Sequence, residues 1–511
     1  MLVKTYGSSV YGIDATKITV EVSIVSGFGI FIVGLPDSAV KESQHRIESA
    51  LLAHHYKMPG KKIVINMAPA DLRKEGSAYD LTLAVGILAA NEQINSDNID
   101  KYIIMGELSL DGSLQPIKGI LPIAVNALKE GFKGMIIPAQ NVREAAVVSE
   151  LDVYGVTNIS EVINFFNGNL QLEKTVVDID QEFKISTRQY ELDFSEVKGQ
   201  ENVKRALEVA AAGGHNVIMI GPPGAGKTMM AKRIAGILPP LTLQEALETT
   251  KIHSVAGRIS RETSLMTHRP FRSPHHTISD IALVGGGTFP QPGEISLAHN
   301  GVLFLDELPE FKRSVLEVMR QPLEDRKITI GRVKFSVDYP ASFMLVSSMN
   351  PCPCGYHNHP DKQCVCAPGM VQKYLNRISG PLLDRIDLHI EIVPVPVRDL
   401  SITRLAETSA SIRERVIKAR QIQSERFKND KVFCNAQMSS KHLRKYIKLN
   451  EAGEKLLGNA VEKLGLSARA YDRIQKVSRT IADLESVENI MPHHIAEAIQ
   501  YRTLDRENWA G

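Results

Sequence analysis

The sequence predicts a multidomain α/β protein with an N-terminal α+β domain, a central domain built on a parallel sheet and a helical C-terminal part. First, its 511 residues exceed what one hydrophobic core usually serves, so we expect two or three domains. Second, strand-like and helix-like segments alternate between about residues 194 and 397, which is typical of a parallel sheet. Third, apolar residues recur every three or four positions within segment 398–511, which indicates amphipathic helices.

The composition sets few limits on function. The formal net charge is +2, which neither supports nor excludes a nucleic-acid partner, because binding needs only a local basic stripe. The N-terminus alternates apolar and polar residues like a strand and lacks the order of a secretion signal. No apolar run approaches the ~20 residues of a membrane span. We therefore expect a cytoplasmic protein without a membrane partner, in which structural disulfides are rare.

Residues 1–170 form the predicted α+β domain. Strand-like runs such as KITVEV, KKIVINM and GMIIPA mix there with helix-like segments such as AYDLTLAVGILAANEQ. Residues 171–193 are charged and poor in core residues, and we interpret them as a linker. The sheet domain then spans 194–397, and 398–511 form a helical lid.

The strongest local signal is GPPGAGKT, which follows the apolar run NVIMI and leads into a helix-like segment. Its glycines allow backbone N–H groups to turn toward phosphates, Lys227 can reach the β- and γ-phosphates of ATP, and Thr228 can bind Mg²⁺. A chance glycine-rich turn is the alternative, and it does not explain the Lys-Thr pair. The predicted nucleotide-binding residues are Gly221, Pro222, Pro223, Gly224, Ala225, Gly226, Lys227 and Thr228.

Two further strands end in polar residues suited to the same chemistry. GVLFLDE is an apolar run followed by two carboxylates, of which Asp306 can hold Mg²⁺ and Glu307 can polarise the attacking water. The strand ASFMLVSSMN ends in Asn350, which can orient that water or sense the γ-phosphate. Asparagine at a strand end is more often a turn former, so its predicted role depends on the other two elements.

In this order, the elements resemble those of AAA+ ATPases. The segments RPFRSPHHTIS, VGGGTFPQPGEISLAHNGVLFLDE, QPLEDRKITIGR and SGPLLDRIDLHIEI resemble magnesium-chelatase-like AAA+ proteins of the ComM/YifB family, and the similarity extends through nearly the whole chain. The resemblance implies an AAA+ P-loop core with a helical lid similar to the C-terminal domain of magnesium chelatase. It also implies ATP and Mg²⁺ as cofactors.

The resemblance assigns roles to arginines outside the phosphate loop. Arg385, in LLDRID, matches a finger that reaches the ATP site of the neighbouring subunit, where a guanidinium offsets charge developing in the transition state. Arg469 matches the lid arginine called sensor 2, and Arg473 is a weaker candidate one turn later. A solvated helix face is the ordinary explanation for a single arginine. A finger acting on a neighbour implies a homo-oligomeric ring, most simply a hexamer.

The same family resemblance suggests where such a ring would grip its substrate. It implies an insert near HTISDIALVGGGTFPQPGEI and a hairpin near KITIGRVKFSVDYP, with Arg332 and Lys334 at the hairpin tip. Six copies would form a basic ring able to hold a DNA phosphate backbone without reading its sequence. Two basic residues in a hairpin are otherwise an ordinary charged turn.

The N-terminal block resembles the proteolytic domain of Lon, and Ser77 falls at the position of its nucleophile. Such a serine needs a base to take up its proton. The position of the Lon lysine is occupied here by Leu121, and Lys118 lies three residues away. We therefore expect a Lon-like fold without peptidase activity, and keep a peptidase as the alternative.

Four of the five cysteines fall within fifteen residues, in the segment 351–367 directly after Asn350. Four thiolates can close a tetrahedral zinc site, which is the usual role of such a cluster in a reducing compartment. A disulfide or redox pair and plain small core residues are the alternatives, and His357 or His359 are substitute ligands. Cys434, far along the chain, is most simply a buried small residue. The predicted zinc ligands are Cys352, Cys354, Cys364 and Cys366.

These features together predict an ATP-hydrolysing ring motor that acts on single-stranded or branched DNA, such as the recombination intermediates of natural transformation. The ATPase rests on the residues themselves, whereas the DNA substrate rests mainly on the resemblance. The alternative is a protein-remodelling ATPase, including a magnesium-chelatase-type motor. The Lon-like block and the lack of a DxSxS motif weigh against the chelatase alternative, although that motif can lie on another polypeptide.

Overall fold

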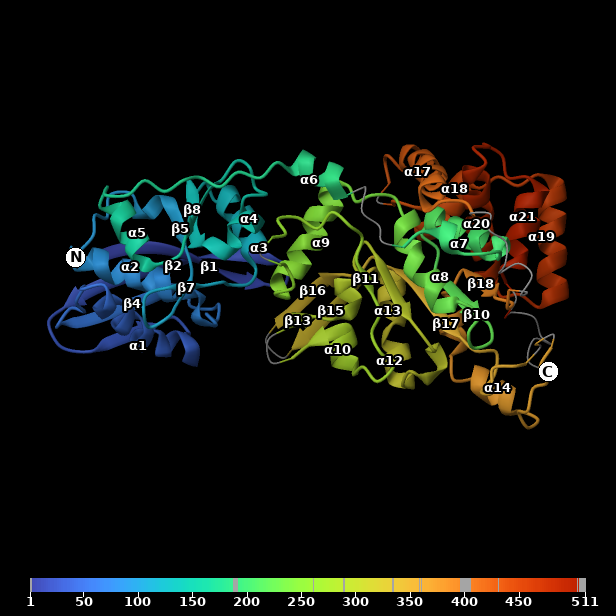
Figure 1. The fold of residues 1–511 in the computed structure, drawn as a ribbon, viewed down its shortest axis with the longest axis horizontal. Coiled ribbons are helices and arrows are strands. Elements are labelled where there is room, and N and C mark those ends of the chain that lie inside the picture. Colours follow the sequence, from blue (N-terminus) through green and yellow to red (C-terminus); the bar gives the residue numbers. More distant parts are fainter. Residues whose placement is uncertain are drawn as a thin grey trace.

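The computed structural model divides the chain into three regions that follow one another along its long axis (Figure 1). An N-terminal sheet domain lies at one end, the parallel-sheet core lies in the middle, and the C-terminal helices lie at the other end. The structure describes residues 2–186, 192–260, 262–287, 290–332, 335–357, 359, 361–395, 406–430, 432–502 and 504.

The N-terminal domain is built on a seven-stranded mixed sheet with strand order β3-β4-β2-β1-β5-β8-β9. Its strands are β1 (Leu2–Tyr11), β2 (Asp14–Val25), β3 (Ile30–Val33), β4 (Lys62–Ala68), β5 (Tyr102–Ile104), β8 (Gly134–Pro138) and β9 (Asp152–Val156), and β6 (Glu107–Leu108) pairs with β7 (Leu114–Gln115) beside it. Its helices are α1 (Ser38–Ala53), α2 (Asp80–Ala90), α3 (Ile120–Lys129), α4 (Val142–Ala145) and α5 (Ile159–Phe166), with 3-10 turns η1 (Ser77–Tyr79), η2 (Ile99–Lys101) and η3 (Ala139–Asn141).

Helix α2 is the centre of this domain. Every residue of its sequence DLTLAVGILAA is buried, because the helix is apolar on all sides and packs against β1 and β2. The only charged side chain in it, Asp80, is paired with Arg46 of α1, with Arg46 Nε at 2.6 Å from Asp80 Oδ2. This pairing allows the carboxylate to remain in the interior.

The central domain contains a five-stranded sheet with order β11-β14-β17-β10-β18, in which every neighbouring pair is parallel, as predicted. These strands are β10 (Val217–Ile220), β11 (Phe271–Arg272), β14 (Val302–Leu305), β17 (Met344–Met349) and β18 (Leu388–Glu391). Two hairpins stand outside the sheet, β12 (Gly285–Gly286) with β13 (Gln291–Pro292) and β15 (Lys327–Arg332) with β16 (Phe335–Pro340). The carboxyl ends of parallel strands share one edge, and they bring the predicted site residues together there.

The helices of this domain cover the sheet and form its hydrophobic clusters. They are α7 (Glu201–Gly213), α8 (Lys227–Arg233), α9 (Leu243–Val255), α10 (Asp280–Val284), α11 (Glu294–Leu297), α12 (Arg313–Val318), α13 (Arg320–Asp325), α14 (Met370–Leu375) and α15 (Gly380–Leu383), with 3-10 turns η4 (Phe194–Glu196), η5 (Ile234–Ile237) and η6 (Leu308–Glu310).

The segment expected to be a linker contains a helix. Residues Ile179–Ser186 form α6, and the apolar side chains of Ile179 and Phe183 pack against a cluster between the N-terminal and central domains. Their spacing of four residues gives even this charged segment one apolar face. The buried members of that cluster are Leu121, Val147, Leu241, Ala246 and Leu265.

The tip of the β1–β2 hairpin also reaches the central domain and contacts β16 (Figure 1). The Tyr11 hydroxyl donates to the Ser336 carbonyl at 3.4 Å, and Ile13 packs against the core cluster that includes Val337. A Cβ on Gly12, whose φ is +65°, would lie 2.8 Å from Cγ1 of Val337. The N-terminal domain therefore supports the β15–β16 hairpin directly.

The C-terminal part is helical, as predicted, and packs against α7 through α17 and α20. Its elements are α17 (Ser409–Arg426), α18 (Ser440–Tyr446), α19 (Glu451–Leu464), α20 (Ala468–Leu484) and α21 (Pro492–Gln500), with the turn η7 (Asn435–Gln437). The backbone of its last segment pairs with β18, since the His389 N–H donates to the Tyr501 carbonyl at 2.8 Å. Among the helices in the described part of the chain, none is both long and apolar enough to cross a membrane.

Candidate active site

The phosphate loop connects β10 to α8 at the carboxyl edge of the sheet. Gly224 and Gly226 have φ angles of +79° and +87°, a left-handed conformation that side chains other than glycine rarely adopt. The ammonium group of Lys227 donates to the carbonyls of Gly221 at 2.7 Å and Pro222 at 2.9 Å. The lysine thus lies across its own loop, where a nucleotide phosphate would meet it.

The structure brings residues that follow two other strands, β14 and β17, to this loop. Lys227 also donates to Asn350 Oδ1 at 3.1 Å, and the Thr228 hydroxyl donates to Asp306 Oδ2 at 2.8 Å. Burial lowers the pKa of Lys227, while the carboxylates of Asp306 and Glu307 act in the opposite direction. The predicted sequence elements therefore converge on one place, although Asp306 lies 78 residues after Thr228 and Asn350 lies 123 residues after Lys227.

The hydroxyl and carboxylate oxygens at the loop suit a magnesium ion. Asp306 Oδ1 accepts a hydrogen bond from the Ser348 hydroxyl and a second one from the Glu307 N–H at 3.1 Å. Mg²⁺ prefers such oxygen ligands, and Thr228 together with Asp306 can supply two of them. Ser348 is completely buried and was not predicted from the sequence. The only signal for it is its place in β17, next to the strand that carries Asp306.

Glu307 is the exposed carboxylate of the site and follows β14 with a left-handed φ of +54°. Its carboxylate lies 3.9 Å from Nδ1 of His276, a residue that sequence reasoning also missed. The His276 ring packs edge-on against Phe311 and lies 4.0 Å, between centroids, from the ring of His275. The two consecutive histidines in RPFRSPHHTIS were visible in the sequence, but their approach to Glu307 was not.

The predicted arginines lie together but have partners other than the phosphate loop. Arg385 is buried, and its guanidinium pairs with Glu324. Burial lowers the pKa of Arg385, whereas Glu324 acts to raise it. Arg469 is 60% exposed and its guanidinium lies 3.3 Å from Asp384, next to Arg385 in the chain. Arg469 thus pairs with the residue that precedes Arg385 in the chain, whereas Arg385 itself pairs with Glu324.

Arg473, the weaker candidate, has a structural partner in the interior. Its guanidinium lies 2.9 Å from Asp387, whose carboxylate is buried. Burial by itself raises the pKa of Asp387, but Arg473 and His215 hold it well below the ordinary value. Arg473 thus stabilises the junction between α20 and the central domain.

The predicted DNA-binding hairpin is present as β15 and β16. Arg332 and Phe335 form the last residue pair of the hairpin before its turn. Lys334 lies outside the described residues, as does the side chain of Arg332. The role of these two residues in DNA binding stays a prediction.

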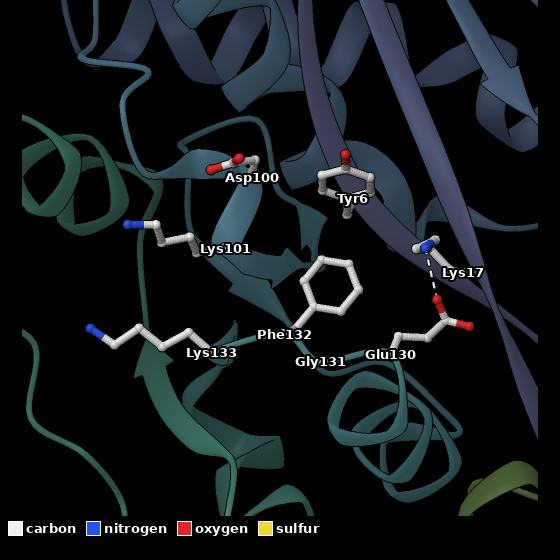
Figure 2. Close-up of a pocket in the computed structure, with 8 residues that line it drawn as sticks. All are labelled: Tyr6, Lys17, Asp100, Lys101, Glu130, Gly131, Phe132 and Lys133. Carbon is white, nitrogen blue, oxygen red and sulfur yellow. Dashed lines mark hydrogen bonds and ion pairs between the residues drawn. The ribbon is translucent and has the colours of Figure 1, made fainter.

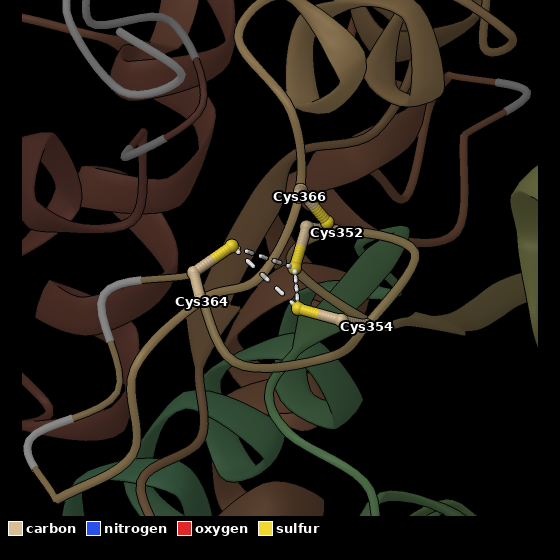
Figure 3. A group of neighbouring side chains, drawn as sticks. All are labelled: Cys352, Cys354, Cys364 and Cys366. Carbon is tan, nitrogen blue, oxygen red and sulfur yellow. Dashed lines mark hydrogen bonds between the residues drawn. The ribbon is translucent and has the colours of Figure 1, made fainter.

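The four cysteines of residues 351–367 meet in space (Figure 3). The Sγ–Sγ distances are 3.3 Å for Cys352–Cys354, 3.5 Å for Cys354–Cys364 and 3.8 Å for Cys352–Cys364, and Cys366 completes the group. Four sulfurs bound to zinc at ~2.3 Å lie about 3.8 Å apart, so the arrangement fits a tetrahedral zinc site.

The other residues considered for this cluster have different contacts. His359 Nδ1 accepts hydrogen bonds from the N–H groups of Asp361 and Lys362 at 3.0 and 3.1 Å, so this nitrogen already has partners. Cys434 is buried far from the cluster, where a Cβ on Gly214 would lie 2.8 Å from its sulfur. It matches the expected small buried residue.

In the N-terminal domain, the described residues do not form the Lon-type pair of serine and lysine. The Ser77 hydroxyl donates to the Glu107 carboxylate. Leu121 is buried in the cluster between the domains, and Lys118 runs along the central domain, since a Cβ on Gly257 would lie 2.7 Å from its Cε. No basic nitrogen among these described residues is therefore in place to activate Ser77.

A pocket of about 400 Å³ lies on the N-terminal domain, away from the predicted site (Figure 2). Two of its charges neutralise each other, because Lys17 Nζ lies 2.7 Å from Glu130 Oε2. The pocket contains none of the residues predicted to bind a nucleotide or a metal. It is lined by Tyr6, Lys17, Asp100, Lys101, Glu130, Gly131, Phe132 and Lys133.

Comparisons with known proteins agree with this architecture. Three family models match, described as "Magnesium chelatase, subunit ChlI" at residues 193–400, "Subunit ChlI of Mg-chelatase" at 20–141 and "Magnesium chelatase, subunit ChlI C-terminal" at 406–502. Competence protein ComM of Haemophilus influenzae is 44% identical over 505 residues, which cover 98% of this chain and 97% of that protein. The chain belongs to the magnesium-chelatase-like ComM/YifB family.

Other relatives of this ComM/YifB-family protein match all or part of it. YifB of Escherichia coli is 44% identical over 497 residues, covering 97% of this chain and 96% of that protein. Lon protease 2 of Bacillus subtilis is 32% identical over 157 residues, or 28% of this chain and 27% of that protein. The family and the phosphate loop indicate an AAA+ ATPase. The similarity to Lon covers only part of the chain.

Proposed function

We propose that this ComM/YifB-family protein is an ATP-hydrolysing ring motor that moves along or remodels DNA, with single-stranded or branched recombination intermediates as substrates. The observation that carries the ATPase is the convergence of Lys227, Thr228, Asp306 and Asn350 at one sheet edge. The DNA substrate is supported by the full-length similarity to a protein named for competence and by the hairpin beside the core.

In this proposal, each residue at the loop has its own role in ATP hydrolysis. Lys227 exchanges its loop carbonyls for the β- and γ-phosphates, and Asn350 orients the water or senses the γ-phosphate. Glu307, exposed beside the loop, polarises the attacking water. Thr228 and Asp306 would hold Mg²⁺, which would supply neutralising charge to the phosphates.

We propose that Arg385 and Arg469 act on the ATP site of a neighbouring subunit. Both have partners away from their own phosphate loop, since Arg385 pairs with Glu324 and Arg469 pairs with Asp384. On assembly, Arg385 exchanges Glu324 for the neighbour's γ-phosphate. A site completed by a neighbour requires a head-to-tail contact between subunits, and a closed ring gives every site such a neighbour, with a hexamer as the form in this proposal.

The cysteine cluster is proposed to hold one structural zinc ion. The thiolates of Cys352, Cys354, Cys364 and Cys366 would be its ligands, because their sulfurs all lie within 4.8 Å of one another.

The family similarity also favours a second candidate, a protein-remodelling or chelatase-type motor. All three matching family models carry the name of a magnesium-chelatase subunit. Such a motor would use the same ATP site but would act on a partner protein.

Movement of a labelled four-way DNA junction distinguishes the two candidates. We expect the wild-type protein with ATP and Mg²⁺ to convert the junction into separated duplex products, and the Glu307→Gln variant to bind it without converting it. If the wild type hydrolyses ATP but leaves the junction and partial duplexes intact, the DNA motor is wrong and the remodelling candidate replaces it.

A further inference from the structure

The cysteine cluster lies directly against the phosphate loop. Gly355, which follows Cys354, is buried and has a φ of +85°. A Cβ on Gly355 would lie 2.5 Å from Cδ and 2.9 Å from Cγ of Pro223, the third residue of the phosphate loop. The Gly355 backbone approaches the Pro223 ring so closely that only glycine fits at this position without a shift of the ring.

A second contact joins the same two segments. Asn350 lies two residues before Cys352, and its Oδ1 accepts a hydrogen bond from Lys227 at 3.1 Å. The phosphate loop therefore touches the cysteine segment at Pro223, and at Lys227 it touches the residue directly before that segment. A displacement of the cysteine segment would change the shape of the loop at both places.

The cysteines determine where Gly355 lies. The Gly355 N–H donates to the Cys352 carbonyl at 3.0 Å, so residues 352–355 form a closed turn. Cys352 and Cys354 belong to this turn, whereas Cys364 reaches the same group of sulfurs from residues farther along the chain (Figure 3). One ion held by all four thiolates would fix the position of the turn. It would thereby hold Gly355 in place against Pro223.

We propose that the four-cysteine cluster is a metal-dependent wall of the ATP site, in which Gly355 is a positioning residue that sets the phosphate loop through Pro223. With zinc bound, the loop keeps the shape that receives phosphates. Without the metal, the turn loosens and affinity for ATP falls. This inference rests on the ATP-binding part of the proposed function and is independent of DNA.

The test measures zinc content and nucleotide affinity in the full-length chain, without DNA. A non-hydrolysable ATP analogue with Mg²⁺ is titrated into the wild type and into Gly355→Ala. We expect about one zinc per chain in both and an affinity lowered about tenfold or more in the variant, because the added methyl group displaces the loop. Gly369→Ala is the matched control, since Gly369 also has a positive φ of +75° but no atom within 4 Å of its Cβ position. This control should bind zinc and the analogue like the wild type.

A double-mutant cycle separates the contact from a general loss of structure. Pro223→Ala removes the two ring atoms that a Cβ on Gly355 would strike. The double variant should therefore bind the analogue as well as Pro223→Ala alone. If the cluster only stabilised the fold, the losses of analogue affinity in the two single variants would instead add in the double variant.

Removal of the metal tests, without any substitution, whether the cluster supports nucleotide binding. We expect chelation of the wild type to weaken analogue binding about tenfold, and added Zn²⁺ to restore it. Wild-type affinity in Gly355→Ala, or in the metal-free wild type, would overturn the proposal, and so would a purified chain that contains no metal yet binds the analogue. Failure of the ATPase itself would appear differently, as a wild type that binds no nucleotide at all.

Discussion

Among single residues, Glu307 is the one that we predict to polarise the attacking water. We expect Glu307→Gln to keep ATP binding and to lower turnover by about 10²–10⁴-fold, because the amide cannot take up a proton from water. Nucleotide binding and phosphate release measured on the same preparation test this. Glu310→Gln is a suitable control, since Glu310 is three residues away and its carboxylate lies 2.9 Å from Arg377 at the surface. Unchanged turnover in Glu307→Gln would remove the assignment.

Several site residues could be predicted from the sequence because their signals are local. Lys227 and Thr228 stand in one continuous motif, and Asp306 follows an apolar run. Ser348 and His276 could not be predicted, because their roles depend on which strands and loops become neighbours in the fold. Residues that act through such long-range contacts carry no spacing pattern of their own.

At the scale of elements, the β15–β16 hairpin is the predicted contact with DNA. We expect Arg332→Ala combined with Lys334→Ala to reduce DNA-stimulated turnover while turnover without DNA is kept, because neither residue belongs to the ATP site. Binding of single-stranded DNA measured over a range of salt should lose about one unit of slope per lost phosphate contact.

The base of the same hairpin provides the control. Lys327 is an exposed lysine whose ammonium lies 2.8 Å from the Asp338 carboxylate, so Lys327→Ala changes the charge of the hairpin without altering its tip. If Lys327→Ala and the tip variant weaken DNA binding equally, the tip has no special role.

Strand β18 forms a junction with the segment that contains Tyr501 and Arg502, and the stability of this junction should depend on pH. Burial holds the pKa of His389 well below its ordinary value of 6.5, and Arg502 acts in the same direction. The unfolded chain therefore binds more protons than the folded one below pH 6.5, and the free energy of unfolding falls as pH decreases. The slope approaches about 1.4 kcal/mol per pH unit.

Thermal or denaturant unfolding between pH 7.5 and 5 measures this slope. His389→Gln should have a smaller slope than the wild type, whatever its overall stability, because glutamine does not titrate. Equal slopes in the two proteins would show that His389 is not a source of the pH dependence.

Some elements could be predicted from the sequence and others could not. The parallel sheet and the helical C-terminal part were predicted, because their apolar patterns are regular over many residues. Helix α6 was missed, since only Ile179 and Phe183 mark its apolar face within a charged segment. The contact of Ile13 with the central domain depends on the orientation of two domains, which no local pattern specifies.

At the scale of the whole molecule, the ATP site should be shared between subunits. Lys227→Ala lacks a working phosphate loop but keeps Arg385, whereas Arg385→Ala has the opposite defect. Each variant alone should be inactive. In an equal mixture, about a quarter of the interfaces in a ring combine an intact loop with an intact finger, so turnover should recover to about that fraction of wild type.

Mixing each variant with wild-type protein provides the reference for this experiment, because it shows whether subunits exchange. If subunits exchange but the two variants together remain inactive, Arg385 does not act on a neighbour and the shared site is wrong.

Coupling of ATP turnover to DNA is tested by measuring turnover of the purified wild type without DNA, with linear single strands and with a four-way junction, at two salt concentrations. We expect single strands or the junction to raise turnover and higher salt to suppress the increase, because phosphate contacts weaken with salt. Turnover that no DNA changes at either salt concentration would show that the motor does not act on DNA and would point to a protein substrate.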